Sequence, residues 1–294
     1  MVMFSLRQTI RLFFLAFVLR AERFESVEPH MGTLVRITIY SNDTSPMRAA
    51  FNRVTELDEK LSDYKPDSEL NRLCRTHGQG VKVSEDLYRV LEASLKLSAL
   101  TDGAFDVTIG PVTHLWRLGK IPEASVMARV GWKQVVLDKK HRTVELKLAG
   151  MQLDLGAIAK GYAADEALKT LRMHGVKRAL IAVSGDIAAG DAPPGSQGWR
   201  VGLEPAGGEI LLRNAAVSTS GDTEQFREIG GVRYSHIIDP KTGLGLRSAI
   251  AVTVIAQRGL DADPIATAVS VLGEKRGRAI FEKRVTKLIV VGVR

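Results

Sequence analysis

The feature that most constrains the fold is the order in which predicted strands and helices follow one another. In the second half of the chain, strands are predicted at 179–183, 199–203, 210–218, 234–238 and 250–255, before the next helix at about 264–272. A parallel sheet would need a helical crossover between successive strands. The order therefore predicts an α+β fold with a mostly antiparallel sheet and packed helices.

The first half of the chain adds one strand and two amphipathic helices. Residues 31–40 alternate apolar and polar side chains, which predicts a strand with one buried face. Ser45 is a good N-cap, and Pro46 fits the first position of the helix that follows. A second helix is predicted to begin at Ser84 and to end near Gly103.

The remaining segments are shorter. Residues 103–119 carry glycines at both ends and in the middle, which indicates a loop that touches a buried surface. A helix is predicted between Gly156 and Gly175, where Gly175 is a natural C′ residue. Short strands are predicted at 135–137, 143–146 and 288–291, and a further helix at about 275–284.

Charge and composition exclude some classes of partner. The chain has 294 residues, of which 45% are hydrophobic, and this is ample for a core. The formal net charge of +8 favours anionic partners. The basic residues are spread along the chain, however, and no aromatic stripe lies between them. We therefore expect a small phosphorylated ligand and no nucleic acid.

The N-terminus is ambiguous. Arg7 and Arg11 precede the apolar stretch 12–19, which resembles a signal peptide and is too short to span a bilayer. Arg20 follows at once, without an A-x-A site or a lipid-accepting cysteine. We expect residues 1–27 to be a targeting segment, with an extracytoplasmic location and peripheral membrane association. The alternative is a disordered or mis-assigned start.

A single cysteine, Cys74, limits the chemistry further. With one thiol the chain forms no internal disulfide and no cysteine-based zinc site. Cys74 lies at apolar spacing in ELNRLC, so we interpret it as a buried structural thiol.

The stretch MQLDLGAIAKGYAADEALKTL, residues 151–171, reads as a strand, a glycine and a helix start. Such a turn can bind phosphate through backbone N–H groups, although the stretch matches neither common nucleotide motif. Gly156 would allow close approach, and Lys160 could reach a phosphate oxygen. The alternative is that Asp154 is a local cap and Lys160 a solvated side chain.

The stretch YSHIIDPKTG contains a candidate base. Asp239 and Pro240 begin a type I turn that Gly243 closes, so structure alone explains these three residues. His236 is predicted to lie on a strand, on the same face as Ile238. Half-buried strand histidines are mostly structural, but His236 is also a candidate general base.

The stretch LDADPIATAVSVLG contains a candidate metal site. Pro264 suits a helix start, which makes Asp263 a natural N-cap. Asp263 and Thr267 are four residues apart and can share a helix face. A carboxylate and a hydroxyl form a hard-oxygen pair suited to Mg²⁺, which prefers few protein ligands plus phosphate. We interpret Asp261 as a solvated neighbour.

Two S-G-D turns, at 184–186 and 220–222, each follow a predicted strand. Small residues there allow close approach of a ligand or another backbone. Each alone indicates only a turn.

Taken together, these segments resemble the ApbE-like FAD:protein FMN transferases. Eight pieces occur in the family's order: MGT at Met31, DYKPDSELNRL at Asp63, GAFDVTIGPVTHLW at Gly103, LDLGAIAKGYAAD at Leu153, SGD at Ser184, STSGD at Ser218, YSHIIDPKTG at Tyr234 and DADPIATAVSVLG at Asp261. The resemblance implies a single ApbE-like, T-fold-related domain over residues 28–294.

The resemblance also implies an activity. Enzymes of this family split FAD at its pyrophosphate and transfer FMN to a Ser or Thr hydroxyl of a target protein, releasing AMP, with Mg²⁺ required. Two alternatives stay open: a Mg²⁺-dependent FAD pyrophosphatase that uses water as acceptor, and a non-enzymatic FAD carrier.

The family's functional positions map onto this chain. His236 resembles the base that deprotonates the acceptor hydroxyl. The metal ligands would be Asp263 and Thr267 through side chains, and Ala157 and Ala266 through backbone carbonyls. The FAD contacts would be Met31, Tyr64, Ala104, Phe105, Asp106, Asp154, Lys160 and Ile237, with Tyr64 and Phe105 as faces for flavin or adenine.

Overall fold

The computed structural model describes residues 21–221, 226–229, 231–248 and 250–292. Its centre is a seven-stranded sheet in which every neighbouring pair is antiparallel. The strands, in spatial order, are β1 (Glu22–His30), β2 (Thr33–Ser41), β6 (Ala179–Val183), β7 (Asp186–Ala189), β10 (Ala215–Gly221), β15 (Ile250–Ala256) and β16 (Lys287–Gly292). The predicted α+β class with a mostly antiparallel sheet is confirmed.

The sheet begins with a hairpin of two strands, of which only the second was predicted from the sequence. The strand expected at 31–40 is β2, and β1 pairs with it through a two-residue turn at Met31 and Gly32. Both turn residues have positive φ, at 52° and 70°, as a tight hairpin turn requires. Residues 22–27, which were expected to lie in the targeting segment, belong to β1, so this strand spans the expected boundary at residue 28.

The apolar stretch 12–19 lies outside the described residues. Within the described parts of the chain, no helix combines the length and the apolar character needed to cross a membrane.

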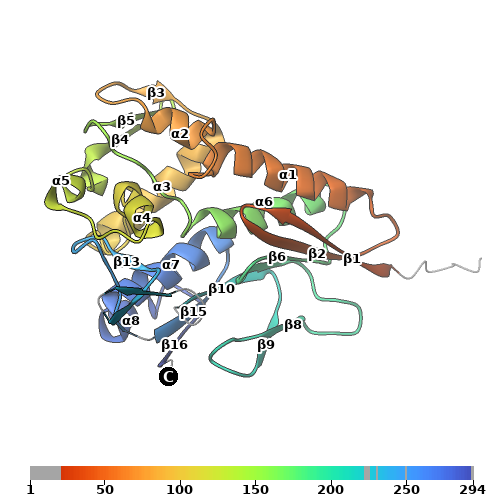
Figure 1. Cartoon of the computed structure of the whole chain (residues 1–294). Helices are drawn as coiled ribbons and strands as arrows, with labels where there is room; N and C mark the ends of the chain where they lie inside the picture. Colours follow the sequence, from red (N-terminus) through yellow and green to blue (C-terminus); the bar gives the residue numbers. More distant parts are fainter. Residues whose placement is uncertain (1–20, 222–225, 230, 249, 293–294) are drawn as a thin grey trace, which may run out of the picture.

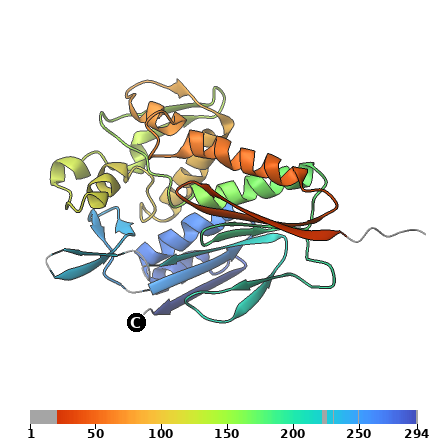
Figure 2. The same cartoon turned by 45° about the vertical axis from the view of Figure 1, so that its right-hand side comes forward.

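Helices cover one face of the sheet. Figures 1 and 2 show α1, α6 and α7 packed side by side above the strands, with α3 at one end. Their bounds are α1 (Ser45–Leu61), α3 (Glu85–Leu100), α6 (Ala159–Met173) and α7 (Gly259–Leu272), followed by α8 (Glu274–Phe281). In α1 the apolar stripe is buried as its spacing predicts, but the N-cap is Thr44, one residue earlier than expected. The N-cap of α3 is Ser84, as predicted.

Smaller units surround this core. They are α2 (Glu69–Cys74), α4 (Gly110–Arg117), α5 (Ala124–Met127), the short 3-10 helix Trp132–Gln134, a three-stranded sheet of β3 (Val81–Lys82), β5 (Thr143–Leu146) and β4 (Val135–Asp138), and the strand pairs β8–β9 (Trp199–Gly202, Glu209–Leu212), β11–β12 (Phe226–Ile229, Val232–Ser235) and β13–β14 (Ile238–Asp239, Leu244–Gly245). The segment 103–119, predicted as a loop, therefore contains α4. The single strand predicted at 210–218 is two strands, because the chain turns at Asn214, whose φ is 46°.

Helix α7 begins five residues earlier than the proline signal predicted. Its first residue is Gly259, so Asp263 lies inside the helix and is not its N-cap. The cap comes instead from α6: the carboxylate of Asp165 accepts hydrogen bonds from Gly259 N at 2.8 Å and Leu260 N at 2.9 Å. Burial raises the pKa of Asp165 to about 6, although these two N–H groups lower it.

Helices α6 and α7 cross at two glycines. A Cβ atom on Gly161 would lie 2.2 Å from the carbonyl oxygen of Gly259, and one on Gly259 would lie 2.3 Å from that of Gly161. At this crossing Gly161 N donates to Asp263 Oδ2 at 3.0 Å. The absence of side chains thus allows a backbone N–H of α6 to reach a carboxylate of α7.

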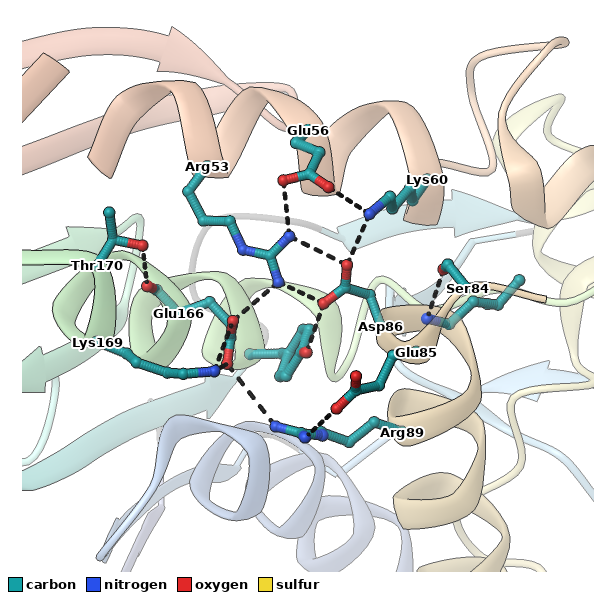
Figure 3. Close-up of polar contacts among 12 residues, drawn as sticks. Arg53, Glu56, Lys60, Ser84, Glu85, Asp86, Arg89, Glu166, Lys169 and Thr170 are labelled. Atoms are coloured by element: carbon teal, nitrogen blue, oxygen red, sulfur yellow. Dashed lines mark hydrogen bonds and ion pairs between the residues drawn. The ribbon is translucent and has the colours of Figure 1, made fainter. Parts of the chain in front are cut away.

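A buried ionic cluster joins α1, α3 and α6 (Figure 3). Arg53 contacts Asp86 and also Glu166, at 2.8 Å. Lys60 Nζ and Tyr162 Oη each lie 2.8 Å from an Asp86 oxygen. Burial alone would raise the pKa of Asp86, but the bonds from Arg53, Lys60 and Tyr162 together lower it well below its usual value.

Replacing Gly161 by alanine should destabilise the protein, because the added Cβ would meet backbone atoms that side-chain rotation cannot move. We expect the free energy of unfolding in urea to fall by about 1–3 kcal/mol. The control is Gly202→Ala, where a Cβ meets nothing within 4 Å. Equal stability of the two variants would contradict the tight crossing.

The Asp86 cluster should make stability depend on pH. Because the folded-state pKa is lowered, the carboxylate stabilises the fold above its unfolded pKa of about 3.9, and this contribution is lost as pH falls below it. Asp86→Asn should therefore lower the free energy of unfolding by about 3 kcal/mol at pH 7. The difference from the parent should shrink below pH 4 in urea titrations; a pH-independent difference would refute the ionic role.

Candidate functional site

Three segments that are far apart in the sequence meet where α6 begins. Lys160, in the first turn of α6, places Nζ 2.6 Å from Asp186 Oδ2 and 3.9 Å from Asp263 Oδ2. Asp186, the last residue of the first S-G-D turn, begins β7, and Asp263 lies inside α7. The structure thus brings together the two predicted site residues Lys160 and Asp263.

Asp186 is a site residue that sequence reasoning missed. It is buried, and its Oδ1 accepts a hydrogen bond from the Ser218 hydroxyl on the neighbouring strand β10. Burial would lower the pKa of Lys160, but the charges of Asp263 and Asp186 raise it, so Lys160 stays protonated. The signal was present in the S-G-D turn, which alone indicated no function.

Asp263 has the features of a cation ligand. Its side chain is buried, and burial together with the charge of Asp186 raises its pKa, against the opposing effects of Lys160 and the Gly161 N–H. Its Oδ2 accepts from Gly161 N, whereas no donor among the described residues lies within hydrogen-bond distance of Oδ1. A buried carboxylate oxygen without a donor suits a metal ion.

The other proposed ligands differ in how well they suit a cation. Thr267 lies one turn after Asp263, is half-buried, and places Oγ1 3.5 Å from Ser220 Oγ. Ala157 is half-buried just before α6. Ala266 offers only its carbonyl oxygen, which lies inside α7 and accepts from the Ser270 hydroxyl at 3.0 Å. The expected donors that remain are Asp263, Thr267 and the Ala157 carbonyl.

This donor set contains only one carboxylate. In the described ranges, no three His, Cys, Asp or Glu side chains cluster as a metal site. One carboxylate, one hydroxyl and one carbonyl form a sparse oxygen set, which suits Mg²⁺ when a ligand's phosphate oxygens complete the coordination.

A second group centres on Arg117, another residue that sequence reasoning missed. Its guanidinium contacts Asp63 and lies 2.9 Å from Asp154 Oδ2, and its Cζ is 4.1 Å from the centroid of the Tyr64 ring. Tyr64 is 73% exposed, so the ring remains open to a ligand. Arg117 was missed because its helix, α4, lies in the segment predicted as a loop.

Asp154 has two partners, one of them in its own turn. Its Oδ1 accepts from Gly156 N at 2.8 Å, as expected of a local cap, while Oδ2 pairs with Arg117. Burial and the charge of Asp154 together raise the pKa of Asp63, against the effect of Arg117. The local reading of Asp154 was therefore correct but incomplete.

The segment 104–106 is more buried than a stacking surface would be. Phe105 is 3% exposed and lies in the main core, so the structure favours Tyr64 rather than Phe105 as the exposed ring. Asp106 is also buried and accepts from Thr108 N, Thr108 Oγ1 and Trp132 N, at 2.8, 2.7 and 2.9 Å. Burial raises its pKa despite these bonds. Ala104 is buried beside them.

His236 lies in a bend and not on a strand as predicted. It is exposed between β12 and β13, whereas Ile238 is buried, so the two do not share a face. Ile237 is buried, and its carbonyl accepts from Leu246 N at 2.8 Å. Trp116 of α4 anchors this segment by donating to the Gly243 carbonyl at 2.6 Å.

Of the other predicted residues, Met31 is half-buried in the β1–β2 turn, at a different place in the fold from the bend that holds His236. Cys74 is free, and burial raises the pKa of its thiol to about 11. A thiol with such a pKa is a poor nucleophile at neutral pH, in keeping with a structural role.

Comparison with known proteins gives a consistent result. The pattern that defines the ApbE family matches residues 31–290. A protein of Treponema pallidum named FAD:protein FMN transferase is 34% identical, over 90% of this chain and 83% of its own length. One of the same name from Vibrio cholerae is 29% identical, over 92% of this chain and 88% of its own.

Solved structures that resemble this chain belong to the same family. A variant of the flavin transferase ApbE from Vibrio cholerae, in which one histidine is replaced by glycine, superposes with a TM-score of 0.83 and 29% identity, over 92% of this chain and 93% of that one. The apo flavinyl transferase ApbE from Pseudomonas stutzeri gives 0.81 and 28%, over 94% and 96%. With sequence and fold in agreement, the chain belongs to the ApbE family.

Proposed function

We propose that this protein transfers the FMN moiety of FAD to a Ser or Thr hydroxyl of a target protein, releasing AMP, in a reaction that depends on Mg²⁺. The observation that carries the proposal is the meeting of Lys160, Asp186 and Asp263 at the α6–α7 crossing. A protonated lysine beside a buried carboxylate that retains a free oxygen suits a metal-bound pyrophosphate.

Each residue has a definable task. Asp263, Thr267 and the Ala157 carbonyl would hold Mg²⁺, which when bound supplies positive charge to the pyrophosphate oxygens. Lys160 would bind a phosphate oxygen, with Asp186 and Ser218 fixing its side chain. The open ring of Tyr64 would stack on the flavin or adenine.

The chemical step is a substitution at phosphorus. The acceptor hydroxyl oxygen forms a bond to the FMN phosphorus, and the bond from that phosphorus to the bridging oxygen breaks. AMP leaves with the electron pair, and the hydroxyl proton passes to His236. Because His236 is exposed, a bulky protein acceptor can approach it.

Two other activities are possible with the same residues: FAD hydrolysis to FMN and AMP, and FAD carriage without reaction. The names of the relatives favour a protein acceptor. Incubation with FAD, Mg²⁺ and a Thr-bearing acceptor domain separates the three. A covalent FMN mass shift supports transfer, AMP release without an adduct supports hydrolysis, and bound intact FAD supports carriage.

We also propose an extracytoplasmic location with peripheral membrane association. The proposal depends on the basic and apolar character of residues 7–19. Fractionation of cells that express the full chain, compared with a chain starting at residue 21, tests it.

Asp263→Asn should abolish transfer. The amide removes the only carboxylate in the donor set, and we expect the rate of adduct formation to fall by about 100-fold or more. The matched control is Asp261→Asn in the same helix, because Asp261 pairs with Arg258 at the surface. Mass spectrometry of the acceptor gives the rate, and the melting temperature verifies folding. A normal rate for Asp263→Asn would exclude the metal assignment.

His236→Ala should slow transfer without weakening FAD binding. Loss of a general base typically costs about 10²–10⁴-fold in rate. The control is His174→Ala, which changes another exposed histidine, at the far end of α6. Adduct formation and flavin fluorescence titration measure the two properties. A variant that transfers at the parent rate would remove His236 as the base.

A further inference from the structure

Helix α7 carries two of the proposed metal ligands and has no cap of its own. Its N-cap residue, Arg258, has an extended backbone and no side-chain cap bond, and the guanidinium pairs with Asp261 at 2.7 and 2.8 Å. The Arg258 carbonyl accepts from Asp261 N and Ala262 N. The N–H groups of Gly259 and Leu260 come before these and have no partner within the helix.

The first turns of α7 are also weak as a helix. Glycine is a poor helix former, and α7 begins at Gly259. Pro264 has no N–H, so the Leu260 carbonyl receives no hydrogen bond from the residue four positions later. Asp263 lies between this glycine and this proline. The segment that holds the carboxylate therefore depends on support from outside the helix.

Asp165 of α6 supplies this support. One of its carboxylate oxygens accepts from Gly259 N at 2.8 Å, and the other accepts from Leu260 N at 2.9 Å. Among the described residues, no other side chain accepts from these two N–H groups. The carboxylate also lies at the positive end of the α7 dipole. Asp165 thus ties the start of α7 to α6.

A second contact between the same two helices lies one turn away. Figures 1 and 2 show α6 and α7 side by side. Gly161, four residues before Asp165 and on the same face of α6, donates its N–H to Asp263 Oδ2 at 3.0 Å. One contact alone would leave α7 free to turn about it. Two contacts about 5–6 Å apart along α6 fix both the position and the direction of α7.

Asp165 is accessible from a cavity. It is half-buried and lines a cavity of about 760 Å³ together with Arg258 and Leu260. Water in this cavity can reach the N–H groups of Gly259 and Leu260 once the carboxylate is removed. We therefore expect a variant without Asp165 to fold, because it loses the tie between the helices without leaving two N–H groups buried and unpaired.

We propose that Asp165 is a positioning residue for the metal site: by tying the start of α7 to α6, it holds Asp263 and Thr267 where they bind Mg²⁺. This inference rests on the proposed function, which assigns the metal to these two side chains. Asp165 itself touches neither the metal nor FAD in this proposal. Its effect is on metal affinity, through the placement of the helix that carries the ligands.

The first test measures Mg²⁺ binding to Asp165→Ala. Mg²⁺ is titrated in the presence of FAD, without an acceptor, and flavin fluorescence gives the midpoint. We expect the midpoint to rise by about tenfold or more. Asp165→Asn, which keeps one acceptor oxygen, should show a smaller rise and serves as the test if the alanine variant does not fold. An unchanged midpoint would overturn the proposal.

Transfer kinetics give a second readout. With an acceptor domain present, the Mg²⁺ concentration at half-maximal rate should rise by the same factor in Asp165→Ala. The kcat at saturating Mg²⁺ should stay within about threefold of the parent, because the reacting groups are unchanged. A loss of kcat that saturating Mg²⁺ does not restore would contradict a role in metal affinity.

Arg258→Ser separates positioning from helix stability. A serine at the N-cap can accept from Leu260 N, so it gives α7 a cap that does not involve α6. Added to Asp165→Ala, it should restore the melting temperature and leave the Mg²⁺ midpoint raised. If the midpoint recovered as well, Asp165 would only cap the helix, and the proposal would be wrong.

Ser84→Ala is the matched control for the loss of a cap. Ser84 caps α3 by accepting from Leu87 N at 3.2 Å, and α3 carries none of the proposed metal ligands. The melting temperature should fall by about 2–4 °C, with an unchanged Mg²⁺ midpoint. A raised midpoint in this variant would mean that any loss of stability weakens Mg²⁺ binding, and would remove the specific role of Asp165.

Asp263→Asn distinguishes a failure of this inference from a failure of the metal assignment. If Mg²⁺ changes the flavin signal of neither the parent nor Asp263→Asn, the assignment is wrong and the inference falls with it. If Mg²⁺ acts on the parent and on Asp165→Ala alike, but not on Asp263→Asn, only the role of Asp165 is overturned.

Discussion

The close crossing of α6 and α7 is the contact on which the proposed site depends. Two glycines, Gly161 and Gly259, allow the helices to approach until a backbone N–H of one reaches the carboxylate of Asp263 on the other. Asp165 then fixes the start of α7 by accepting from its first N–H groups. Both constraints come from α6, so the helix that carries Lys160 also sets the position of Asp263.

The charges next to Asp263 have opposite effects on its ionisation. Burial and the neighbouring Asp186 disfavour the charged form of Asp263, while Lys160 favours it. Such an arrangement costs stability unless the carboxylate gains partners, because an incompletely paired buried charge is expensive. A cation bound at Asp263 would satisfy its free oxygen. The unfavourable burial of the Asp263 charge therefore lies where a bound ligand could offset it, and carboxylates with shifted pKa values are common at functional sites.

Local patterns predicted the regular elements well and the boundaries less well. The stripe of α1 and the N-cap of α3 follow directly from side-chain spacing and capping chemistry. The start of α7 was misplaced because its cap, Asp165, lies 94 residues before Gly259. Strand β1 was missed because none of its side chains is fully buried and its half-buried positions, Phe24, Ser26, Glu28 and His30, are mostly polar, so its sequence shows no alternation of apolar and polar residues. Helix α4 was missed because its glycine and proline suggested a loop.

The sequence by itself determined the fold class, the family resemblance, and the residues Lys160, Asp263 and His236 as candidates, because strand order, motif order and side-chain chemistry are local properties. Only the tertiary structure revealed that Lys160 pairs with Asp186, which is itself bonded to Ser218, that Arg117 lies against Tyr64, and that Phe105 is buried. The first two kinds of contact join residues that are 26 to 53 positions apart in the chain, and the burial of Phe105 depends on how the core packs around its ring. No local pattern encodes such distances, since they arise when sheet pairing and helix crossing bring distant segments together.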